Sequence, residues 1–549
     1  MFDGGSEYLN ADSIEIIPGG VQAKCAARGD HGWTIRPGRL LDPLWAGLYS
    51  NQFVWEDNRV RYSATIAIWL ILTGCLTGCG PEGLRLRPVD SPSCSEAFKS
   101  FDTHGDGRAD FFLLANAAGR VDRIGYDVSG AGKPDVVIGL DDLREDQCRH
   151  LVIILDGFGY DVVRKYYDDG GLRFCHVPSK VIATYPTMTD LCLADALRVA
   201  PCPALQARYY DFKTNDSTGG ALAYLASTNE PYNRVLGYRA EKSQDGLAFL
   251  QGWPVFQTDL RDLMRAFNKS PSHEIIGYLV SSAAISTRDG AAGQRKCLEQ
   301  VDLAVAQILW QTHGLVKVTI FADHGHGYKP PIMVDFETLL KARGWHFTDH
   351  LHEARDVSFV PMGVVTEASF NARRPALLAA DLAECSGVEL ASFVEGDQVV
   401  VLSHDHGRAT IRKIGRGYTY QAAAGDPLQL HEALAGLTAD AQGAYDADQV
   451  LKATVNSAYP AAPERLWRAH FGLVENPGNV LVSLQDDRCS GLNVFKDLVA
   501  IASTHGSLNR INSTTFIMST LGPLPPVMRS RDIPANMTQL LGVRWPETR

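Results

Sequence analysis

Two carboxylates and a histidine follow two β-type runs that lie far apart in the chain. Asp156 follows the apolar run 151–155, and Asp323 and His324 follow the run 316–322. Short, mostly β-branched apolar runs that end in a turn signal predict buried strands. In open α/β sheets, ligands bind at the carboxyl ends of the strands. One such Asp usually only opens a turn, but two strand ends that carry carboxylate and imidazole groups predict a metal site.

A threonine stands where another β-type run gives way to a helix. The run 180–184 is interrupted by Pro186, and a helical pattern begins at Thr189. This order predicts Thr189 as the N-cap of the helix, a role that needs no chemistry. The position also suits a reacting hydroxyl, because a helix N-terminus favours an alkoxide and a neighbouring phosphate. The two interpretations do not exclude each other.

An α/β core has to position these side chains. Helical patterns are expected at 160–167, 293–312 and 333–345, and a further strand at 275–282. Residues 350–450 are expected to form a smaller mixed lobe. Within that lobe, the sequence Ser-His-Asp-His-Gly at 403–407 lies between two strand patterns, so a hairpin turn is favoured over a metal site.

Charge and cysteine content narrow the functional classes. The 549 residues include 52 Lys and Arg against 63 Asp and Glu, a net charge of −11. This balance argues against nucleic-acid binding, which usually needs a basic face, but permits a small anion held by a metal. The eleven cysteines form no CxxC pair, and Cys192 and Cys202 could form a local disulfide in an oxidising compartment.

An apolar segment at 62–74 has the pattern of an export signal. Basic residues precede it, and Leu-Thr-Gly-Cys79 follows it, which resembles the lipobox of bacterial lipoproteins, where the Cys becomes the lipidated first residue. Because signal peptides begin a chain, translation is expected to start near Val60. The mature protein would then begin at Cys79. The alternative is a buried apolar helix.

An Asp/Gly-rich repeat follows this segment. Its first copy places Asp102, Asp106 and Asp110 at positions 1, 5 and 9 of a calcium loop, with a glycine at position 6. His104 at position 3 is a poor calcium ligand, and the second copy has Ala131 in place of the central Asp. A Ca²⁺ ion is predicted at the first loop only. The alternative is a pair of turns between short strands.

Four motifs in chain order resemble the alkaline phosphatase superfamily, and most closely its type I phosphodiesterase/nucleotide pyrophosphatase branch. They are Asp156 after a buried strand, Pro-Thr-Met-Thr189 at a helix start, Ala-Asp323-His324-Gly-His, and Thr-His505-Gly. The resemblance covers about residues 148–530. It implies a doubly wound, mostly parallel central sheet with helices on both faces. It also implies a catalytic centre in which substrate phosphate bridges two zinc ions.

The resemblance assigns roles to particular residues. It implies that Thr189 is the nucleophile and also a metal ligand. The rest of that metal site would be Asp156, Asp323 and His324, and His505 would belong to the second metal.

The second metal site departs from the family pattern. The pattern Ser-Thr-Asp-x-x-x-His is replaced here, so that Ala283 stands for the Asp and Thr287 for the His. A methyl group cannot bind a cation, and a neutral hydroxyl is a weak zinc ligand. Asp289, His326 and His505 are the candidates to replace the lost ligands. One metal site is therefore expected intact and the second degraded.

The resemblance thus implies an exported, metal-dependent hydrolase of phosphomonoesters or phosphodiesters that forms a covalent phospho-Thr189 intermediate. The alternative is an inactive superfamily member that binds a phosphorylated or anionic ligand. The implied cofactor is one or two zinc ions or another divalent metal. The expected partners are a small phosphorylated substrate and a membrane reached through the lipid anchor, with location at the cell envelope or in the periplasm.

These expectations divide the chain into five parts. Residues 1–58 lie outside the mature protein, 59–79 are the signal peptide with its lipobox, 80–145 hold the repeat, 148–345 with 475–530 form the catalytic core, and 346–474 form the inserted lobe.

Overall fold

The computed structural model describes residues 15–17, 20–22, 86–90, 94, 97–205, 208–220, 230–359, 363–491 and 499–547. The chain divides into two compact units, Met1–Ala67 and Ile68–Arg549. In the first unit, the described residues form one antiparallel pair, β1 (Glu15–Ile17) with β2 (Gly20–Gln22). The predicted signal segment 59–79, with Cys79, lies outside the described residues. None of the helices that the structure describes is both long and apolar enough to cross a membrane.

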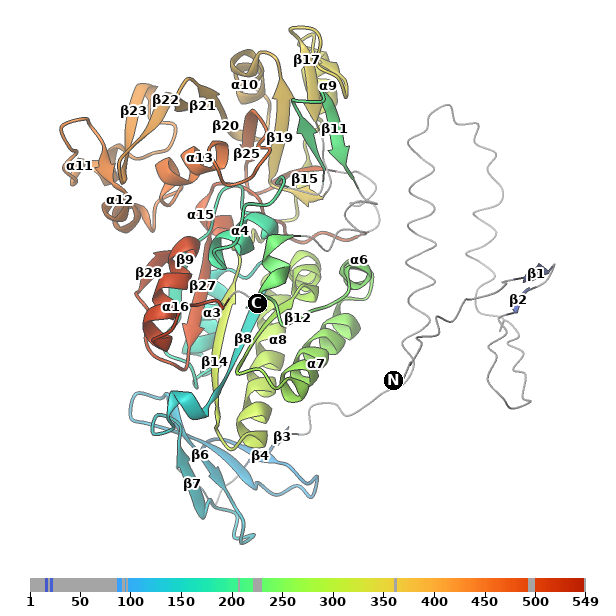
Figure 1. The fold of residues 1–549 in the computed structure, drawn as a ribbon, viewed down its shortest axis with the longest axis vertical. Coiled ribbons are helices and arrows are strands. Elements are labelled where there is room, and N and C mark those ends of the chain that lie inside the picture. Colours follow the sequence, from blue (N-terminus) through green and yellow to red (C-terminus); the bar gives the residue numbers. More distant parts are fainter. Residues whose placement is uncertain are drawn as a thin grey trace, which may run out of the picture. The chain divides into compact units, whose positions relative to one another are not determined.

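A seven-stranded mixed sheet forms the centre of the second unit (Figure 1). Its order is β12 (Tyr238–Arg239), β13 (Glu274–Leu279), β8 (Arg149–Leu155), β14 (Val316–Ala322), β27 (Thr514–Ser519), β9 (Ser179–Ile182) and β28 (Val527–Arg529). All pairings are parallel except the two made by β27, so β27 runs against the other six strands. The apolar runs 151–155 and 316–322 are buried strands of this sheet, as predicted.

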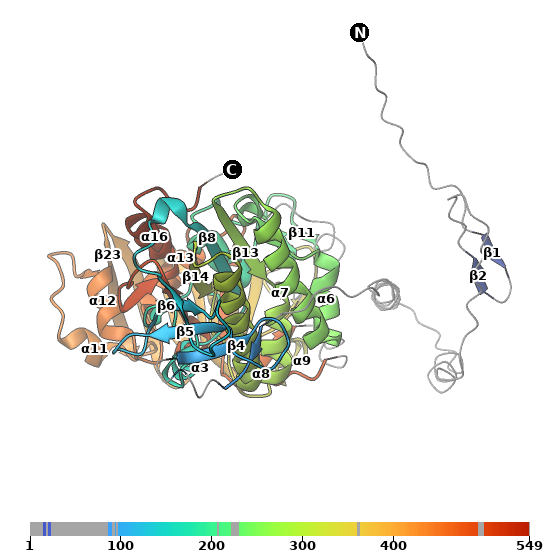
Figure 2. The same cartoon turned by 90° about the horizontal axis from the view of Figure 1, so that it is seen from below.

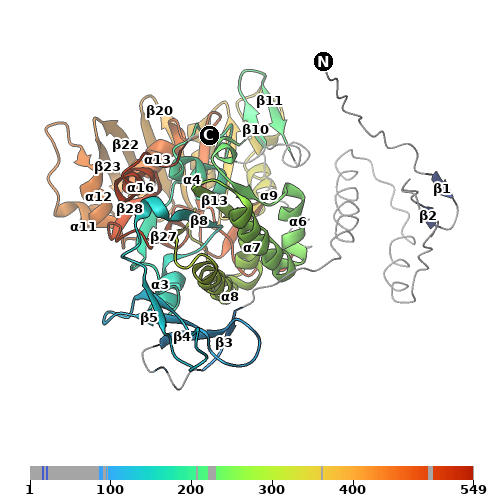
Figure 3. The same cartoon turned by 60° about the horizontal axis from the view of Figure 1, so that its bottom comes forward.

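Helices cover both faces of this sheet. Leu151, Ile153 and Leu155 of β8 pack in one core with α3 (Tyr160–Asp168), α7 (Gly252–Lys269) and α8 (Ser281–Gln311). The intervening residues Val152 and Ile154 pack in another core with α4 (Thr189–Ala196) and α16 (Ile533–Leu541). Figure 2 shows α7 and α8 side by side, and Figure 3 shows α4 and α16 across β8 and β13 from them. Burial on both faces explains why β8 is apolar throughout rather than alternating.

The predicted helices agree with the structure in part. The helix expected at 160–167 is α3. The one expected at 293–312 is the second half of α8, which begins at Ser281 and bends at Gly290, where φ is 57°. Residues 281 and 282 were expected to end a strand, but β13 stops at Leu279. The helix expected at 333–345 is shorter, α9 (Phe336–Lys341).

A nine-stranded sheet forms the smaller lobe. Its order is β16 (His346–Phe347), β17 (Asp356–Phe359), β19 (Glu367–Ala372), β25 (Val480–Leu484), β20 (Val388–Glu395), β21 (Gln398–Ser403), β22 (Gly407–Ile414), β23 (Gly417–Gly425) and β24 (Tyr445–Asp446). Residues 403–407 form the hairpin turn between β21 and β22, as predicted. Because β25 lies in this sheet, the chain returns to the seven-stranded sheet only at β27.

A five-stranded antiparallel sheet carries the Asp/Gly repeat. It consists of β3 (Arg87–Pro88), β4 (Ala97–Asp102), β5 (Phe111–Ala115), β6 (Val121–Tyr126) and β7 (Val136–Gly139). The two copies are the loops β4–β5 and β6–β7. In the first loop, backbone N–H groups of His104 and Gly107 donate to the Asp102 carboxylate at 2.9 and 2.8 Å, and Thr103 donates to Asp110. These bonds are those of a self-capped turn, and calcium at Asp102, Asp106 and Asp110 stays a prediction.

The remaining strands form two small sheets, β10–β11 and β15–β26–β18, and the remaining helices lie between the strands along the chain. They are β10 (Arg208–Asp211), β11 (Asp216–Gly219), β15 (Ile332–Met333), β18 (Val364–Val365), β26 (Arg488–Gly491), α6 (Lys242–Leu250), α10 (Pro375–Ala383), α11 (His431–Ala435), α12 (Ala447–Thr454), α13 (Ala462–His470), α15 (Arg510–Ser513), and the 3₁₀ helices η1 (Glu145–Gln147), η2 (Pro231–Arg234) and η3 (Ser530–Asp532). Cys192 and Cys202 are free thiols here, not a disulfide.

Candidate metal and nucleophile site

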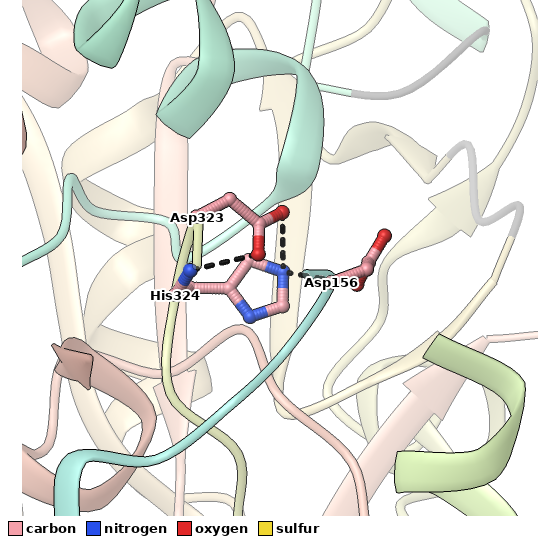
Figure 4. Close-up of side chains that lie close together, drawn as sticks. All are labelled: Asp156, Asp323 and His324. Carbon is pink, nitrogen blue, oxygen red and sulfur yellow. Dashed lines mark hydrogen bonds and ion pairs between the residues drawn. The ribbon is translucent and has the colours of Figure 1, made fainter. Parts of the chain in front are cut away.

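Strand register brings the first two carboxylates together. β8 and β14 are parallel neighbours in which Leu155 pairs with Ala322. The next residue on each strand, Asp156 and Asp323, therefore stands at the same carboxyl edge of the sheet. With His324 they form the only group of three metal-ligand side chains found among the described residues, with ligand atoms within 4.8 Å of one another. Figure 4 shows the three side chains lying close together.

Hydrogen bonds to the backbone use one ligand atom of Asp323 and one of His324, and leave the other ligand atom of each side chain available. Oδ1 of Asp323 accepts the N–H groups of Gly157 at 3.0 Å and of His324 at 2.9 Å. Its Oδ2 is buried with no hydrogen bond among the described residues and lies 3.4 Å from Nε2 of His324. Nδ1 of His324 donates to the Gly325 carbonyl at 2.8 Å, so Nε2 carries the lone pair. Metal-binding histidines are held in the same way.

Thr189 lies on the open side of this group. It is the first residue of α4, and Met188 is the N-cap, so the helix begins one residue earlier than predicted. The Thr189 hydroxyl oxygen is 3.4 Å from Oδ2 of Asp156 and 3.5 Å from Nε2 of His324. Thr189 is half-buried, whereas the three ligand side chains are buried. Thr189 is therefore the least buried of these four residues.

The electrostatics of the group call for a cation. Burial raises the pKa of Asp323 to about 7. Burial and the neighbouring Asp323 charge hold the pKa of Asp156 well above its usual range. Burial also lowers the pKa of His324 to about 3, so the imidazole is neutral. Two buried carboxylates and a neutral imidazole with a free lone pair fit Zn²⁺, since an ion would compensate charges that are otherwise costly to bury.

Two further residues support Asp156, and sequence reasoning did not find them. The Tyr278 hydroxyl on β13 donates to Oδ2 of Asp156. The Asp156 N–H donates to Oγ of Ser282 at 2.7 Å, and Ser282 donates onward to the Leu279 carbonyl at 2.7 Å. Both lie in the segment 275–282, for which the sequence pattern predicts only a strand. Their role depends on the parallel pairing of β13 with β8, which no local pattern reveals.

The region of the expected second metal contains the two substitutions seen in the sequence. Ala283 and Thr287 lie on α8, and Asp289 is exposed. Ala283 offers no ligand atom. The Thr287 carbonyl accepts the N–H groups of Ala502 and Ser503 at 2.8 and 3.1 Å, which fixes the segment before His505 against α8.

Two histidines nevertheless lie beside the first site. The His505 ring stacks on that of His324 with centroids 4.0 Å apart, and its Nδ1 donates to the Thr187 carbonyl at 2.7 Å. The buried His326 ring lies 5.3 Å from that of His505. The sequence named His326 only as a candidate replacement ligand. The structure therefore gathers Asp156, Thr189, Asp323, His324 and His505, and adds His326.

Comparisons with known proteins find similar solved structures but no similar sequence or family. No protein-family model and no curated sequence matches this chain. Human and murine ectonucleotide pyrophosphatase/phosphodiesterase 5 each align with a TM-score of 0.41 and 11% identity, over 73% of this chain and 96% and 97% of theirs. A murine structure of an inactive form in complex with AMP aligns with a TM-score of 0.38 and 10% identity, over 73% of this chain and 97% of that one.

These neighbours belong to the branch of the alkaline phosphatase superfamily that the four motifs resemble. At such TM-scores the alignment has no weight for the reaction. The chemistry has to come from the site itself.

Proposed function

We propose that this chain is a metal-dependent hydrolase of phosphate esters, built on a doubly wound, alkaline-phosphatase-like core with inserted lobes. The observation that supports it is the convergence of Asp156, Asp323 and His324 beside the half-buried Thr189 hydroxyl. Zn²⁺, or another divalent ion that accepts two carboxylates and an imidazole, is the proposed cofactor.

The residues have distinct tasks in this reaction. A bound divalent ion supplies Lewis acidity, which lowers the pKa of a hydroxyl and draws in phosphate. Thr189 loses its proton to solvent, its oxygen bonds to phosphorus, and the bond from phosphorus to the ester oxygen breaks. The ester oxygen leaves as an alcohol after taking up a proton from solvent. Water then attacks the phospho-threonine and releases phosphate or a phosphomonoester. The first N–H groups of α4 stabilise the negative charge at Thr189 throughout.

A ligand-binding protein without turnover is the second candidate. It is favoured by one observation, the absence of ligand atoms at Ala283 and the weak ligand at Thr287. Two-metal sites stabilise both the attacking and the leaving oxygen. A chain with only the first site could bind a phosphorylated ligand and fail to expel its leaving group.

Export and membrane attachment are a further part of the proposal. They rest on the segment 59–79 and on lipidation of Cys79 at the cell envelope. The proposed substrate is a small phosphorylated molecule, either a monoester or a diester. Mass spectrometry of the mature N-terminus tests the export proposal, which peptides from before residue 60 would contradict.

Metal content and turnover measured on the same preparation test the reaction. The purified protein is assayed for zinc per chain and for hydrolysis of p-nitrophenyl mono- and diesters. Thr189→Ala should lose turnover at least 100-fold, while Thr214→Ala, at an exposed loop position, should retain it. A fully active Thr189→Ala protein would refute the nucleophile assignment. Bound metal without turnover of any ester would favour the binding protein.

A further inference from the structure

His326 carries a buried nitrogen that has no partner. Its side chain is 1% exposed, and Nε2 makes no hydrogen bond within the part of the chain that the structure describes. The first metal site does not use it, because the group found there consists of Asp156, Asp323 and His324. An unpaired polar atom in a dry interior destabilises the fold unless something binds it.

The hydrogen bonds around His326 fix which of its nitrogens is bare. Oγ of Ser503 donates to the Ser286 carbonyl at 2.7 Å, so its hydrogen is committed. Nδ1 of His326, 2.8 Å from the same Oγ, must therefore be the donor of that pair. The Gly327 carbonyl, 3.2 Å from Nδ1, can also only accept. His326 thus has its hydrogen on Nδ1 and a lone pair on Nε2.

His505 is fixed in the same tautomer. Its Nδ1 donates to the Thr187 carbonyl at 2.7 Å, which leaves the lone pair on Nε2. The neighbouring imidazoles of His326 and His505 thus each donate a hydrogen bond from Nδ1 to the protein and keep an unshared lone pair on Nε2. This is the arrangement of metal-ligating histidines, in which an outer acceptor holds the other ring nitrogen.

The spacing of the two rings allows both to bind one ion. Their centroids are 5.3 Å apart. Two imidazoles on one tetrahedral zinc, with Zn–N bonds of about 2.0 Å, have centroids roughly 5 Å apart. Gly157 makes room for the His326 ring, since a Cβ at this position would lie 2.8 Å from its Cδ2.

We propose that His326 and His505 bind a second divalent cation of the zinc type, beside the site of Asp156, Asp323 and His324. The two imidazoles replace the ligands absent at Ala283 and Thr287. This inference builds on the proposed function, but it assigns a site of different composition. With two neutral protein ligands the ion keeps its full charge and has positions open to water or an anion. Binding should be weaker than at the first site, which has two carboxylates.

Zinc binding to the full chain, measured by chelator competition and elemental analysis, tests the proposal. This measurement does not depend on catalytic activity. The wild-type protein should bind two zinc ions per chain with different affinities. His326→Gln should lose the weaker ion and keep the tighter one. His404→Gln, at an exposed position of the β21–β22 turn, is the matched control and should keep both. Asp323→Asn should instead weaken the tighter ion.

A second variant covers the risk that His326→Gln misfolds. Ser503→Ala leaves both ligands in place and removes the hydroxyl that accepts from the His326 Nδ1–H and donates to the Ser286 carbonyl. It should weaken the second ion about 10- to 100-fold, the usual effect of losing an outer-shell partner, and leave the first unchanged. One zinc per chain in the wild type, or unchanged affinities in Ser503→Ala, would overturn the His326–His505 site. Unchanged zinc binding in Asp323→Asn would instead refute the metal site of the proposed function.

Discussion

Asp323→Asn should change the pH dependence of stability in the metal-free protein. Burial raises the pKa of Asp323 from 3.8 to about 7. Between these values the folded state holds a proton that the unfolded state has released. Stability of the metal-free fold must therefore fall with rising pH in this window, by about 1.4 kcal/mol per pH unit, and level off above about pH 7.

The size of this change in the free energy of unfolding can be worked out for the pH range in which unfolding is measured. From pH 5 to pH 7, Asp323 alone should lower the free energy of unfolding by roughly 2–3 kcal/mol. In Asp323→Asn this contribution disappears, because an amide does not titrate. The amide oxygen can still accept from Gly157 and His324, and its NH₂ group replaces Oδ2, which lies 3.4 Å from Nε2 of His324. The metal-free variant should thus be more stable than the wild type at pH 8.

Urea unfolding in the presence of a chelator at pH 5, 6, 7 and 8 measures this difference. Comparing the two proteins measures the titration of Asp323 together with the part of the Asp156 pKa shift that the Asp323 charge causes, because the other titrating groups are present in both. With saturating zinc the order should reverse, since binding stabilises the native state and the variant binds less tightly. Equal pH slopes for both metal-free proteins would refute the claim that Asp323 is a buried, uncompensated carboxyl group.

Two further substitutions test the support of the site. Gly157→Ala should destabilise the fold by more than about 1–2 kcal/mol and impair metal binding, because φ is 70° and the new Cβ would lie 2.8 Å from Cδ2 of His326. Thermal unfolding should show a smaller effect for Gly130→Ala, where φ is 75° and no atom lies within 4 Å of the new Cβ. Equal destabilisation by the two substitutions would contradict the packing argument. Tyr278→Phe removes the hydroxyl that donates to Asp156 and should weaken zinc binding about 10-fold with the fold intact. An unchanged zinc affinity in chelator competition would show that this hydrogen bond does not orient the carboxylate.

Local patterns predicted the parts of the site that follow single strands. The run 151–155 and the Asp after it, and the run 316–322 with Asp323 and His324, could be read because a buried strand and its end are local features. Boundaries were less certain. Thr189 begins α4 one position after its N-cap, and the small polar residues from Ser281 onwards start α8 where a strand was expected to continue.

The same local patterns do not predict which distant segments of the chain lie next to each other in the fold. His326 and His505 are 179 positions apart in the chain. Their rings are neighbours because Ser503 is bonded to α8 and to His326, and because the Thr504 carbonyl accepts the N–H of Gly327. Likewise β25 was placed with the catalytic core, yet its hydrogen bonds put it between β19 and β20 of the other sheet. Such long-range pairings carry no local signal.

Residue types and their order along the chain are thus enough to name the chemistry: two carboxylates, imidazoles and a threonine at strand and helix ends. Which of these atoms share one site was decided by the register of Leu155 with Ala322 and by the bonds around Ser503. The physical reason is that a side chain's type fixes what it can bind. Which lone pairs of that side chain remain free, and which side chains lie beside it, depends on the distant backbone groups that accept its hydrogens. Only folding brings those backbone groups next to the side chain.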